Sequence, residues 1–253
     1  MPAPRVALIT GASRGIGRAI AHGLASAGYA VAITGTDTDA LAMVADEIVD
    51  LGGSSATVIA CDLAEPGAPY RLHDAVVTAL GSLDVLVNNA ARGASANLAP
   101  VISFDDEAWE RTIHLNVTVP YQLAKAALPS MIEARWGRII NIASIHADVP
   151  LARGVAYTAS KHALVGLTRT IALETARDGV TANAICPGPV RTRMAGVRLA
   201  YEAERLGLDP AEIVERMTPL GRLLEPEEIA PLAVYLASDA AAGVTGQSYT
   251  IGG

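Results

Sequence analysis

A short apolar run that leads into a glycine-rich loop constrains the fold more strongly than any other part of the chain. Residues 6–10 are apolar up to a closing threonine, and such runs are typical of strands that are covered on both faces of a parallel sheet. The sequence continues as Thr10-Gly11-Ala12-Ser13-Arg14-Gly15-Ile16-Gly17. Its glycines allow a sharp turn and let the backbone approach a ligand closely.

The same segment predicts a site for a pyrophosphate. A helix that begins near Gly15 presents free backbone N–H groups and its positive dipole end to such a group. A glycine-rich loop alone is common, but here it follows a strand and opens a helix in the first βαβ unit, which is the context of a dinucleotide site. We therefore favour nucleotide binding over a purely structural turn.

The end of the second predicted strand, residues 30–34, bears on the choice between NAD and NADP. In NAD-binding folds an acid at this point accepts hydrogen bonds from ribose hydroxyls. Gly35 stands at the expected position, and Asp37 follows two residues later. Because Arg14 in the neighbouring loop can pair with a ribose 2′-phosphate, we favour NADP. The alternative is that Arg14 is solvated and Asp37 caps the next helix.

Apolar runs alternate with helical stretches along the rest of the chain, as in a parallel α/β sheet. Further strands are expected at residues 56–61, 85–87, 138–144, 180–185 and 248–251, and helices at residues 40–51, after Pro66 and Pro69, at 104–135, around Tyr157 and up to residue 236. Since no linker or repeat divides the chain, we predict one Rossmann-type α/β domain over residues 1–253. Its doubly wound parallel sheet has about seven strands with helices on both faces. The charged residues 191–217 are predicted to form a substrate lid.

Several polar residues follow predicted strands, at the sheet edge where ligands bind in open α/β folds. Asp62 can reach an adenine amino group, or it can cap the helix that follows. Asn88 and Asn89 can tie neighbouring strands together and face a ribose. Ser144 ends the predicted fifth strand, while Asn116 lies inside an apolar helical stretch, where a buried amide needs hydrogen-bond partners.

Tyr157 and Lys161 lie four residues apart in a stretch that favours helix, so they share one face. A phenol normally loses its proton near pH ~10, and a neighbouring ammonium favours the phenolate and lowers this pKa. The pair therefore predicts a proton donor and acceptor. Because Tyr-x-x-x-Lys pairs are also common on protein surfaces, this interpretation depends on the nucleotide site and on Ser144.

Composition excludes several classes of function. The chain is 51% hydrophobic and 18% charged, which is typical of a folded domain. Its net charge of −7 argues against a nucleic-acid or anionic membrane partner. Cys61 and Cys186 have no Cys or His at metal-ligand spacing, so we expect no metal and two reduced thiols. We find neither signal-peptide architecture nor an apolar run of transmembrane length, and we expect a cytoplasmic protein.

Together these segments resemble the short-chain dehydrogenase/reductase family over essentially the whole chain. Its glycine motif matches residues 10–17, and its Asn-Asn-Ala motif matches residues 88–90. The family's catalytic asparagine, serine, tyrosine and lysine match Asn116, Ser144, Tyr157 and Lys161. The segment that holds the nicotinamide matches Pro187-Gly188-Pro189-Val190-Arg191-Thr192. Four motifs in the family's order argue against a chance resemblance.

The resemblance implies an oxidoreductase that moves hydride between NADP or NAD and a carbonyl or secondary alcohol. It implies that Tyr157 exchanges a proton with the substrate oxygen, that Ser144 hydrogen-bonds this oxygen, and that Lys161 holds the ribose. Asn116 would hold a water that passes protons from Lys161. The implied cofactor residues are Gly11, Ser13, Arg14, Gly15, Ile16, Gly17, Thr36, Asp62, Leu63, Asn89, Ala90, Tyr157, Lys161, Pro187, Gly188, Val190 and Thr192. The expected substrate residues are Arg92, Ser144, His146 and Met194.

Two subgroups of the family share local features with this chain. The first loop is similar to that of 3-oxoacyl carrier-protein reductases, in which an arginine at the Arg14 position faces the NADP phosphate. Residues 136–146 and 183–188 are similar to 3-hydroxybutyrate dehydrogenases, which hold a substrate carboxylate on a histidine at the His146 position and a lysine near Val155. That lysine is missing here, and Ala91 replaces a usual glycine. His146 is equally interpreted as a packed or solvated imidazole, so 3-oxoacyl, hydroxy acid and polyol substrates all stay open.

Two other functions are weighed against this one. A non-catalytic dinucleotide-binding scaffold or redox sensor would be expected to have a broken catalytic set, and this set is whole. Family members that retain their nicotinamide for epimerisation or dehydration are usually longer and carry a Gly-x-x-Gly-x-x-Gly loop, and this chain has neither feature. From the family we also expect a homotetramer, or a homodimer.

Overall fold

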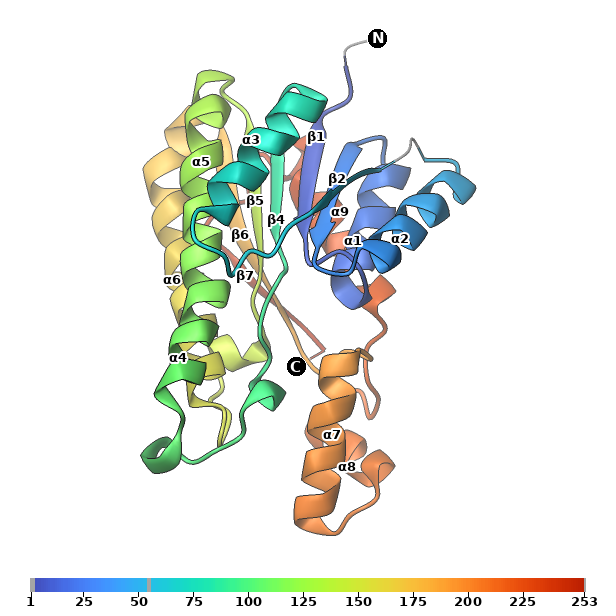
Figure 1. Ribbon diagram of the computed structural model, residues 1–253, viewed down its shortest axis with the longest axis vertical. Helices are drawn as coiled ribbons and strands as arrows, with labels where there is room; N and C mark the ends of the chain where they lie inside the picture. Colours follow the sequence, from blue (N-terminus) through green and yellow to red (C-terminus); the bar gives the residue numbers. More distant parts are fainter. Residues whose placement is uncertain (1–2, 54–55, 253) are drawn as a thin grey trace.

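The computed structural model describes residues 3–53 and 56–252. The strands are β1 (Val6–Thr10), β2 (Ala30–Gly35), β3 (Thr57–Ala60), β4 (Val85–Asn88), β5 (Gly137–Ile142), β6 (Val180–Pro187) and β7 (Ser248–Ile251). They form one sheet in the order β3-β2-β1-β4-β5-β6-β7, and all neighbouring strands are parallel (Figure 1). This confirms the predicted Rossmann-type architecture. The strand order reverses between β1 and β4, which is where ligands bind in such sheets.

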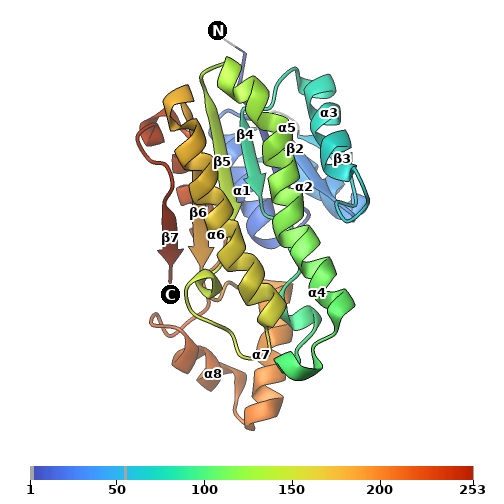
Figure 2. The ribbon, with the colours of Figure 1, turned by 90° about the vertical axis from the view of Figure 1, so that its left-hand side faces the viewer.

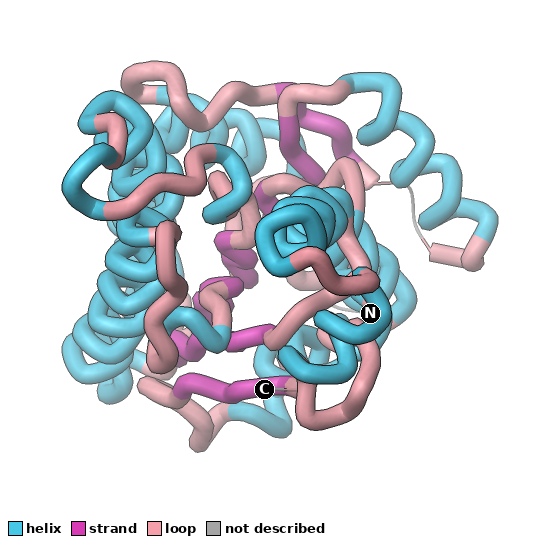
Figure 3. The backbone as a smooth tube through the Cα atoms, turned by 90° about the horizontal axis from the view of Figure 1, so that it is seen from below, coloured by secondary structure: helices cyan, strands magenta, loops and turns pink. Residues whose placement is uncertain are grey.

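Helices cover both faces of the sheet. One face packs against α1 (Gly15–Ser26), α2 (Thr38–Asp50) and α9 (Ala230–Ala237), and the other against α3 (Ala68–Leu80), α5 (Val119–Glu133) and α6 (Val155–Thr175). A shorter helix, α4 (Asp106–Ile113), leads into α5. Viewed toward the carboxyl ends of the strands, the sheet is a twisted row between these helical layers (Figure 3).

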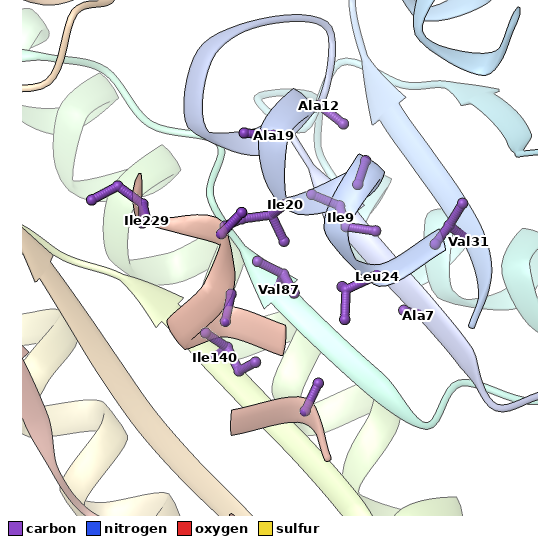
Figure 4. Packing of buried hydrophobic residues seen from close by; sticks show 14 of the residues in the cluster. Ala7, Ile9, Ala12, Ala19, Ile20, Leu24, Val31, Val87, Ile140 and Ile229 are labelled. Carbon is purple, nitrogen blue, oxygen red and sulfur yellow. The ribbon is translucent and has the colours of Figure 1, made fainter. Parts of the chain in front are cut away.

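The first strand shows why its sequence is apolar throughout. Ala7 and Ile9 pack in the hydrophobic cluster on the α1 side, whereas Val6 and Leu8 pack in the cluster on the α5 side. Successive strand residues point to opposite faces, so a strand covered on both faces needs an unbroken apolar run. Figure 4 shows Ile9 among the packed side chains of the first cluster, with Val87 of β4 beside it.

The residues predicted as a lid form two helices, α7 (Arg193–Leu206) and α8 (Pro210–Met217). They project past the carboxyl ends of the strands (Figures 1 and 2). Thr192 caps the start of α7 and Asp209 caps the start of α8, each by accepting a backbone hydrogen bond. Gly207 ends α7 with φ of +65°, a conformation that favours glycine. Local sequence signals therefore define this helical unit.

Several element boundaries differ from the sequence expectations by one or two residues, among them the end of β6, which runs to Pro187 rather than to residue 185. β5 ends at Ile142, so Ser144 lies beyond the strand, at the start of a single helical turn. α2 begins at Thr38 rather than at residue 40, because the Asp37 side chain caps it by accepting from Ala40 N–H. The helix expected over residues 104–135 contains a π-helical turn at His114–Thr118, a feature that is frequent at functional sites.

Candidate active site

Close contacts around the glycine loop leave no room for side chains. Gly11 and Gly15 have φ of +63° and +57°, in the left-handed region that favours glycine. A Cβ on Gly11 would lie 2.9 Å from Ala90 Cα, and one on Gly17 would lie 2.4 Å from the Gly11 carbonyl oxygen. Because α1 begins at Gly15, its unpaired N–H groups stand at the end of this loop. The loop therefore has the backbone shape that a pyrophosphate needs.

Polar side chains after β4 hold the glycine loop in place. Asn89 Nδ2 donates to the carbonyl oxygens of Thr10 at 2.8 Å and Gly11 at 3.0 Å. The Thr10 hydroxyl accepts in turn from the Asn89 N–H at 2.9 Å. Asn88 Nδ2 donates to Asn141 Oδ1 at 2.8 Å, which ties β4 to β5. The two asparagines thus join neighbouring strands, as expected, and both Asn89 amide hydrogens serve the loop.

A groove of about 370 Å³ lies at the carboxyl ends of β1 to β5. The expected cofactor residues that line it are Gly11, Ser13, Arg14, Gly15, Ile16, Thr36, Asp62, Leu63, Asn89, Ala90, Tyr157, Lys161 and Thr192. Gly17 is not among them, and it packs against the Gly11 carbonyl and the Asn89 side chain instead. Gly35 and Ala91, which the sequence discussion names without placing them in the cofactor set, also line the groove, and the lining residues not named from the sequence are Cys61, Leu115, Ile142, Ala143 and Arg193. Most of these residues stand next to a predicted motif. Their position beside a strand end is the sequence feature that could have identified them as lining the groove.

At the end of the groove next to β2, Asp37 caps the following helix, as one interpretation expected, and Arg14 lines the groove, as the other expected. Asp37 caps α2 through Ala40 N–H at 3.1 Å, and its other oxygen accepts from Arg14 Nη2 at 3.0 Å. Arg14 is half-exposed and lines the groove beside Gly35. Its guanidinium is therefore paired, and it is placed where an adenosine ribose would end.

Asp62 also lies at this end of the groove. Its Oδ1 accepts a hydrogen bond from Ala64 N–H at 2.9 Å, which caps the local turn. The helix that follows, α3, is preceded by Gly67 in the left-handed region rather than by a side-chain cap. Asp62 is therefore not the cap of that helix, and its groove-lining position agrees with the adenine interpretation.

Lys161 is buried one turn after Tyr157 on α6. Only 3% of Lys161 is exposed, and its Nζ donates to the Ile142 carbonyl oxygen at 2.8 Å. Nζ lies 5.5 Å from the centre of the Tyr157 ring. Burial disfavours the ammonium and lowers the Lys161 pKa to about 8.

The pKa of Tyr157 differs from the sequence expectation. Burial of the phenol raises this pKa, and a hydrogen bond from the Ser144 hydroxyl opposes the rise. The sequence predicted a lowered value from the nearby ammonium, but Nζ of Lys161 is directed to the Ile142 carbonyl. Removal of the phenolate from water is thus the larger effect, and Tyr157 is protonated at neutral pH.

Asn116 has the hydrogen-bond partners that a buried amide requires. Its Oδ1 accepts from Arg92 N–H at 2.8 Å, and its Nδ2 donates to the Arg92 carbonyl at 3.0 Å and to Ser160 Oγ at 2.9 Å. Asn116 stands in the π-helical turn. Both amide hydrogens are used, so its side chain joins the segment after β4 to α6.

Ser144 and His146 lie beside the Tyr157 ring. Ser144 Oγ accepts from His146 N–H at 3.2 Å, and the His146 and Tyr157 rings meet edge to face with centroids 6.2 Å apart. The His146 Nδ1 lies 3.0 Å from the Val149 carbonyl oxygen. Burial lowers the His146 pKa, so the imidazole is neutral at neutral pH.

A second pocket, of about 170 Å³, adjoins the groove at Tyr157. We call it the substrate pocket. The expected residues that line it are Ile16, Ser144, His146, Tyr157, Pro187, Gly188, Val190, Thr192 and Met194. Arg92 lines neither this pocket nor the groove, and its backbone is held by Asn116. Pro187, Gly188 and Val190 line the substrate pocket, which shares Ile16, Tyr157 and Thr192 with the groove, and their contact with the nicotinamide stays a prediction.

Other lining residues of the substrate pocket were not singled out from the sequence. They are Ala94, Ser95, Ala143, Ile145, Leu151, Pro189, Ala195, Arg198, Leu199 and Met217. Met194, Ala195, Arg198 and Leu199 have the spacing of one helical face. That spacing, within the predicted lid, was the signal that could have identified the α7 residues.

Among residues 3–53 and 56–252, no cluster of three His, Cys, Asp or Glu side chains could hold a metal ion. Cys61 is half-buried and Cys186 is buried, and both are free thiols. In the same described part of the chain, we find no helix with the length and apolar character needed to cross a membrane.

Comparison with known proteins finds matches along nearly the full length. A family model described as short chain dehydrogenase matches residues 5–202. The D-beta-hydroxybutyrate dehydrogenase of Rhizobium meliloti (strain 1021) is 35% identical, over 98% of this chain and 97% of that protein. The crystal structure of actinorhodin polyketide ketoreductase with NADPH superimposes with a TM-score of 0.91 and 34% identity, over 98% of this chain and 95% of that one. For the 3-oxoacyl (acyl-carrier-protein) reductase of Agrobacterium tumefaciens C58 with NADP bound, the TM-score is 0.89 and the identity 34%, over 98% and 93%.

Proposed function

The chain belongs to the short chain dehydrogenase family and is an oxidoreductase of hydroxyl or keto groups, and we propose that its substrate is a small carbonyl compound or secondary alcohol, with NADP as the favoured cofactor. One observation carries this proposal. Tyr157 lines both the dinucleotide groove and the substrate pocket. A protonated phenol at this junction can exchange a proton with a substrate oxygen in one pocket while the nicotinamide occupies the other.

The groove fits a dinucleotide. Gly11 and Gly15 form a backbone cradle that a Cβ would fill, and α1 directs its amino end toward it. When bound, the nicotinamide supplies or accepts the hydride. NADP is favoured because Gly35 stands where NAD-binding folds carry an acid, and because Arg14 lines the same end of the groove. The similar reductases with bound NADPH and NADP support this choice.

The residues of the chain divide the remaining work. In reduction, Tyr157 gives its proton to the carbonyl oxygen, and in oxidation it receives one from the alcohol. Ser144 hydrogen-bonds the same oxygen as charge develops. Lys161 holds the ribose and, with a pKa near 8, can return a proton to Tyr157. Asn116 positions the segment that carries Arg92. We also propose that a water held beside Asn116 passes protons from Lys161.

The substrate class stays within 3-oxoacyl compounds, hydroxy acids and polyols. We propose that residues 191–217, as α7 and α8, act as a lid over the substrate pocket within a single domain of residues 1–253, because Met194 and Met217 of these helices line that pocket. A homotetramer or homodimer in the cytoplasm completes the proposal. The free thiols of Cys61 and Cys186 suit a reducing compartment.

A turnover assay tests the function. The purified protein is incubated with hydroxy acids, sugars, polyols and acyl thioesters and with each cofactor, and absorbance of the reduced nicotinamide is recorded. Tyr157→Phe should lower turnover about 10²- to 10⁴-fold on any active substrate, while dinucleotide affinity measured by fluorescence stays within about threefold. Tyr235→Phe, at an exposed tyrosine on α9, is the matched control and should retain activity. Full activity in Tyr157→Phe would refute the proposed acid.

A further inference from the structure

A third pocket, of about 320 Å³, lies beside the substrate pocket, between α7, α8 and the loop before α6. Four arginines and one glutamate are among its lining residues, so we call it the arginine pocket. They are Arg153, Arg198, Arg205, Arg216 and Glu202. It shares Leu151, Arg198 and Met217 with the substrate pocket, so the two pockets adjoin.

Positive charge exceeds negative charge around the arginine pocket. Glu202 is only 6% exposed and pairs with both Arg198 and Arg205. Arg216 pairs with Glu212 on α8. The four guanidinium groups of the pocket therefore meet two carboxylates, and two positive charges are in excess. Such an excess favours an anionic ligand.

Arg198 is the arginine that lines both pockets. Its Nη2 pairs with Glu202, but Nε and Nη1 are buried and have no hydrogen-bond partner among the described residues. These two nitrogens carry three of the five guanidinium N–H donors. Buried donors without acceptors are unfavourable, especially on a charged group. An anionic oxygen at this point would satisfy them.

His146, the other basic side chain that lines the substrate pocket, cannot take this role at neutral pH. Its Nδ1 lies 3.0 Å from the Val149 carbonyl, which only accepts, so Nδ1 carries the proton. The lowered pKa of the ring leaves Nε2 as an unprotonated acceptor. An anion would meet a lone pair there, whereas Arg198 offers donors and a permanent charge.

We propose that the substrate carries an anionic group, a carboxylate or a phosphate, at the end remote from its reacting carbon, and that Arg198 binds this group where the two pockets meet. The inference rests on the proposed function, because it places the reacting oxygen at Ser144 and Tyr157. Between these ends the walls include apolar side chains such as Leu151 and Leu199. The pocket of about 170 Å³ is close in size to a cavity that holds benzene, so the body has on the order of four to six carbons.

Matched substrates and variants test this inference. We would measure kcat/KM for hydroxy acids of about four to eight carbons, for their methyl esters, and for the corresponding hydroxyalkyl phosphates. The unsubstituted protein is expected to prefer an anion over its ester by about ten- to a hundredfold. Arg198→Met should abolish this preference, and Arg198→Lys should retain part of it, because the charge remains.

Two further variants allow the test to be completed even if Arg198→Met fails to fold. Arg111→Met on α4 also removes an arginine that pairs with a glutamate one turn away, and it should leave the anion-to-ester ratio unchanged. Arg153 is exposed and donates to the Tyr201 hydroxyl at 3.2 Å, so Arg153→Met removes one charge of the pocket without disturbing Glu202. It should lower the ratio by about two- to fivefold, even if Arg198→Met does not fold.

The outcomes separate this inference from the proposed function. The anion with the higher kcat/KM decides between carboxylate and phosphate. Equal rates for anions and esters in every variant would overturn the anion subsite and leave the oxidoreductase function intact. If no substrate turns over, titration of butanoate into the NADP-saturated protein by calorimetry tests the subsite alone. Binding that weakens about tenfold in Arg198→Met supports it, and equal or absent binding in both proteins overturns it.

Discussion

At the scale of single residues, burial separates the pKa values of the two groups at the centre of the site. It raises the pKa of Tyr157 and lowers that of Lys161 to about 8, because each charged form loses its water. Tyr157 therefore keeps its proton at neutral pH, which is the state that donates to a carbonyl. The hydrogen bond with Ser144 opposes the rise, and in the proposed mechanism the same serine would also hydrogen-bond the substrate oxygen.

The buried lysine predicts a dependence of stability on pH. The Lys161 pKa falls from 10.5 to about 8 on folding, so the folded state binds the proton less tightly than the unfolded state. This destabilises the folded protein fully below pH 8, and the penalty disappears as pH rises toward 10.5. Its size is about 3 kcal/mol. The free energy of unfolding in urea is measured for the unsubstituted protein and for Lys161→Met between pH 8 and 10.5. The unsubstituted protein should gain about this amount of stability relative to the variant as the pH rises through that range.

Lys125 provides the control for this measurement. It is the other lysine of the chain and is exposed on α5, so Lys125→Met should show no comparable trend with pH. If the difference in the free energy of unfolding between the unsubstituted protein and Lys161→Met does not change with pH, the Lys161 ammonium is not removed from water in the folded protein.

Gly35 predicts how the cofactor preference can be reversed. A Cβ there would make only ordinary contacts, 3.7 Å from Ser13 Oγ and 3.9 Å from Leu41 Cδ1, so Gly35→Asp should fold. Its carboxylate would accept ribose hydroxyls and repel a 2′-phosphate. We expect the ratio of kcat/KM for NADP over NAD to fall at least about tenfold. In the opposite sense, Asp37→Asn releases Arg14 and should raise that ratio. No change in either variant would contradict the placement of the adenosine end.

At the scale of elements, the glycine loop and α6 are held by partners that come from other strands. Asn89, after β4, braces the loop after β1, and Asn141 of β5 donates to Thr168 Oγ1 of α6 at 2.8 Å. Buried amide bonds of this kind fix relative positions that apolar packing alone leaves less specific. The nucleotide loop and the catalytic helix are thereby joined through the centre of the sheet.

Substitutions at two glycines of this loop should have different effects. Gly15→Val places a side chain at the amino end of α1, 3.2 Å from Thr192 Cγ2, and should abolish dinucleotide binding measured by calorimetry. Gly17→Ala drives a Cβ into the Gly11 carbonyl, 2.4 Å away, and should lower the thermal midpoint, because backbone must move.

Backbone strain at Gly15 needs its own control. Gly28 also has a left-handed φ, +88°, but a Cβ there would meet nothing within 4 Å. Gly28→Val should therefore cost stability by strain and keep dinucleotide affinity. Equal loss of affinity in Gly28→Val and Gly15→Val would show that strain, and not occupation of the pyrophosphate site, explains the effect.

At the scale of the whole molecule, α4, α5 and α6 share one outer face (Figure 2). Large apolar side chains stand on it in contact with solvent, including Tyr121 at 46% and Leu173 at 84% exposure. Exposed apolar groups gathered on one face are typical of interaction surfaces. At the carboxyl ends of the strands, α7 and α8 project from the end of the molecule (Figures 1 and 2), so we expect lid motion and assembly to use different surfaces.

We expect a homotetramer, or a homodimer, in light scattering of the purified protein. Leu173→Glu should shift the mass toward the monomer, because a buried interface would have to accept an unpaired charge. Met43→Glu is the control, since Met43 is 64% exposed and lies on α2, which covers the other face of the sheet. A monomer at all concentrations, or equal effects of the two variants, would contradict the assembly proposal.

Much of the fold and of the groove could be predicted from sequence because the signals are local. The apolar run of β1, the glycines after it and the Tyr157–Lys161 spacing each depend on neighbours within a few residues. They therefore identified the parallel sheet, the glycine loop and the helix that carries Tyr157 and Lys161. Element ends were less certain, since a cap such as Asp37 shifts a helix start without altering its periodicity.

The tertiary structure decided what depends on residues far apart in the chain. Asn116 is bound by the Arg92 backbone, 24 positions away, and Arg92 does not line the substrate pocket. Lys161 is directed to the Ile142 carbonyl, 19 positions away, and burial rather than the ammonium governs the pKa of Tyr157. Arg198 lines the pocket because α7 stands beside residues 94–96, which follow β4. Sequence patterns record local geometry, whereas burial and long-range partners exist only once the chain is folded.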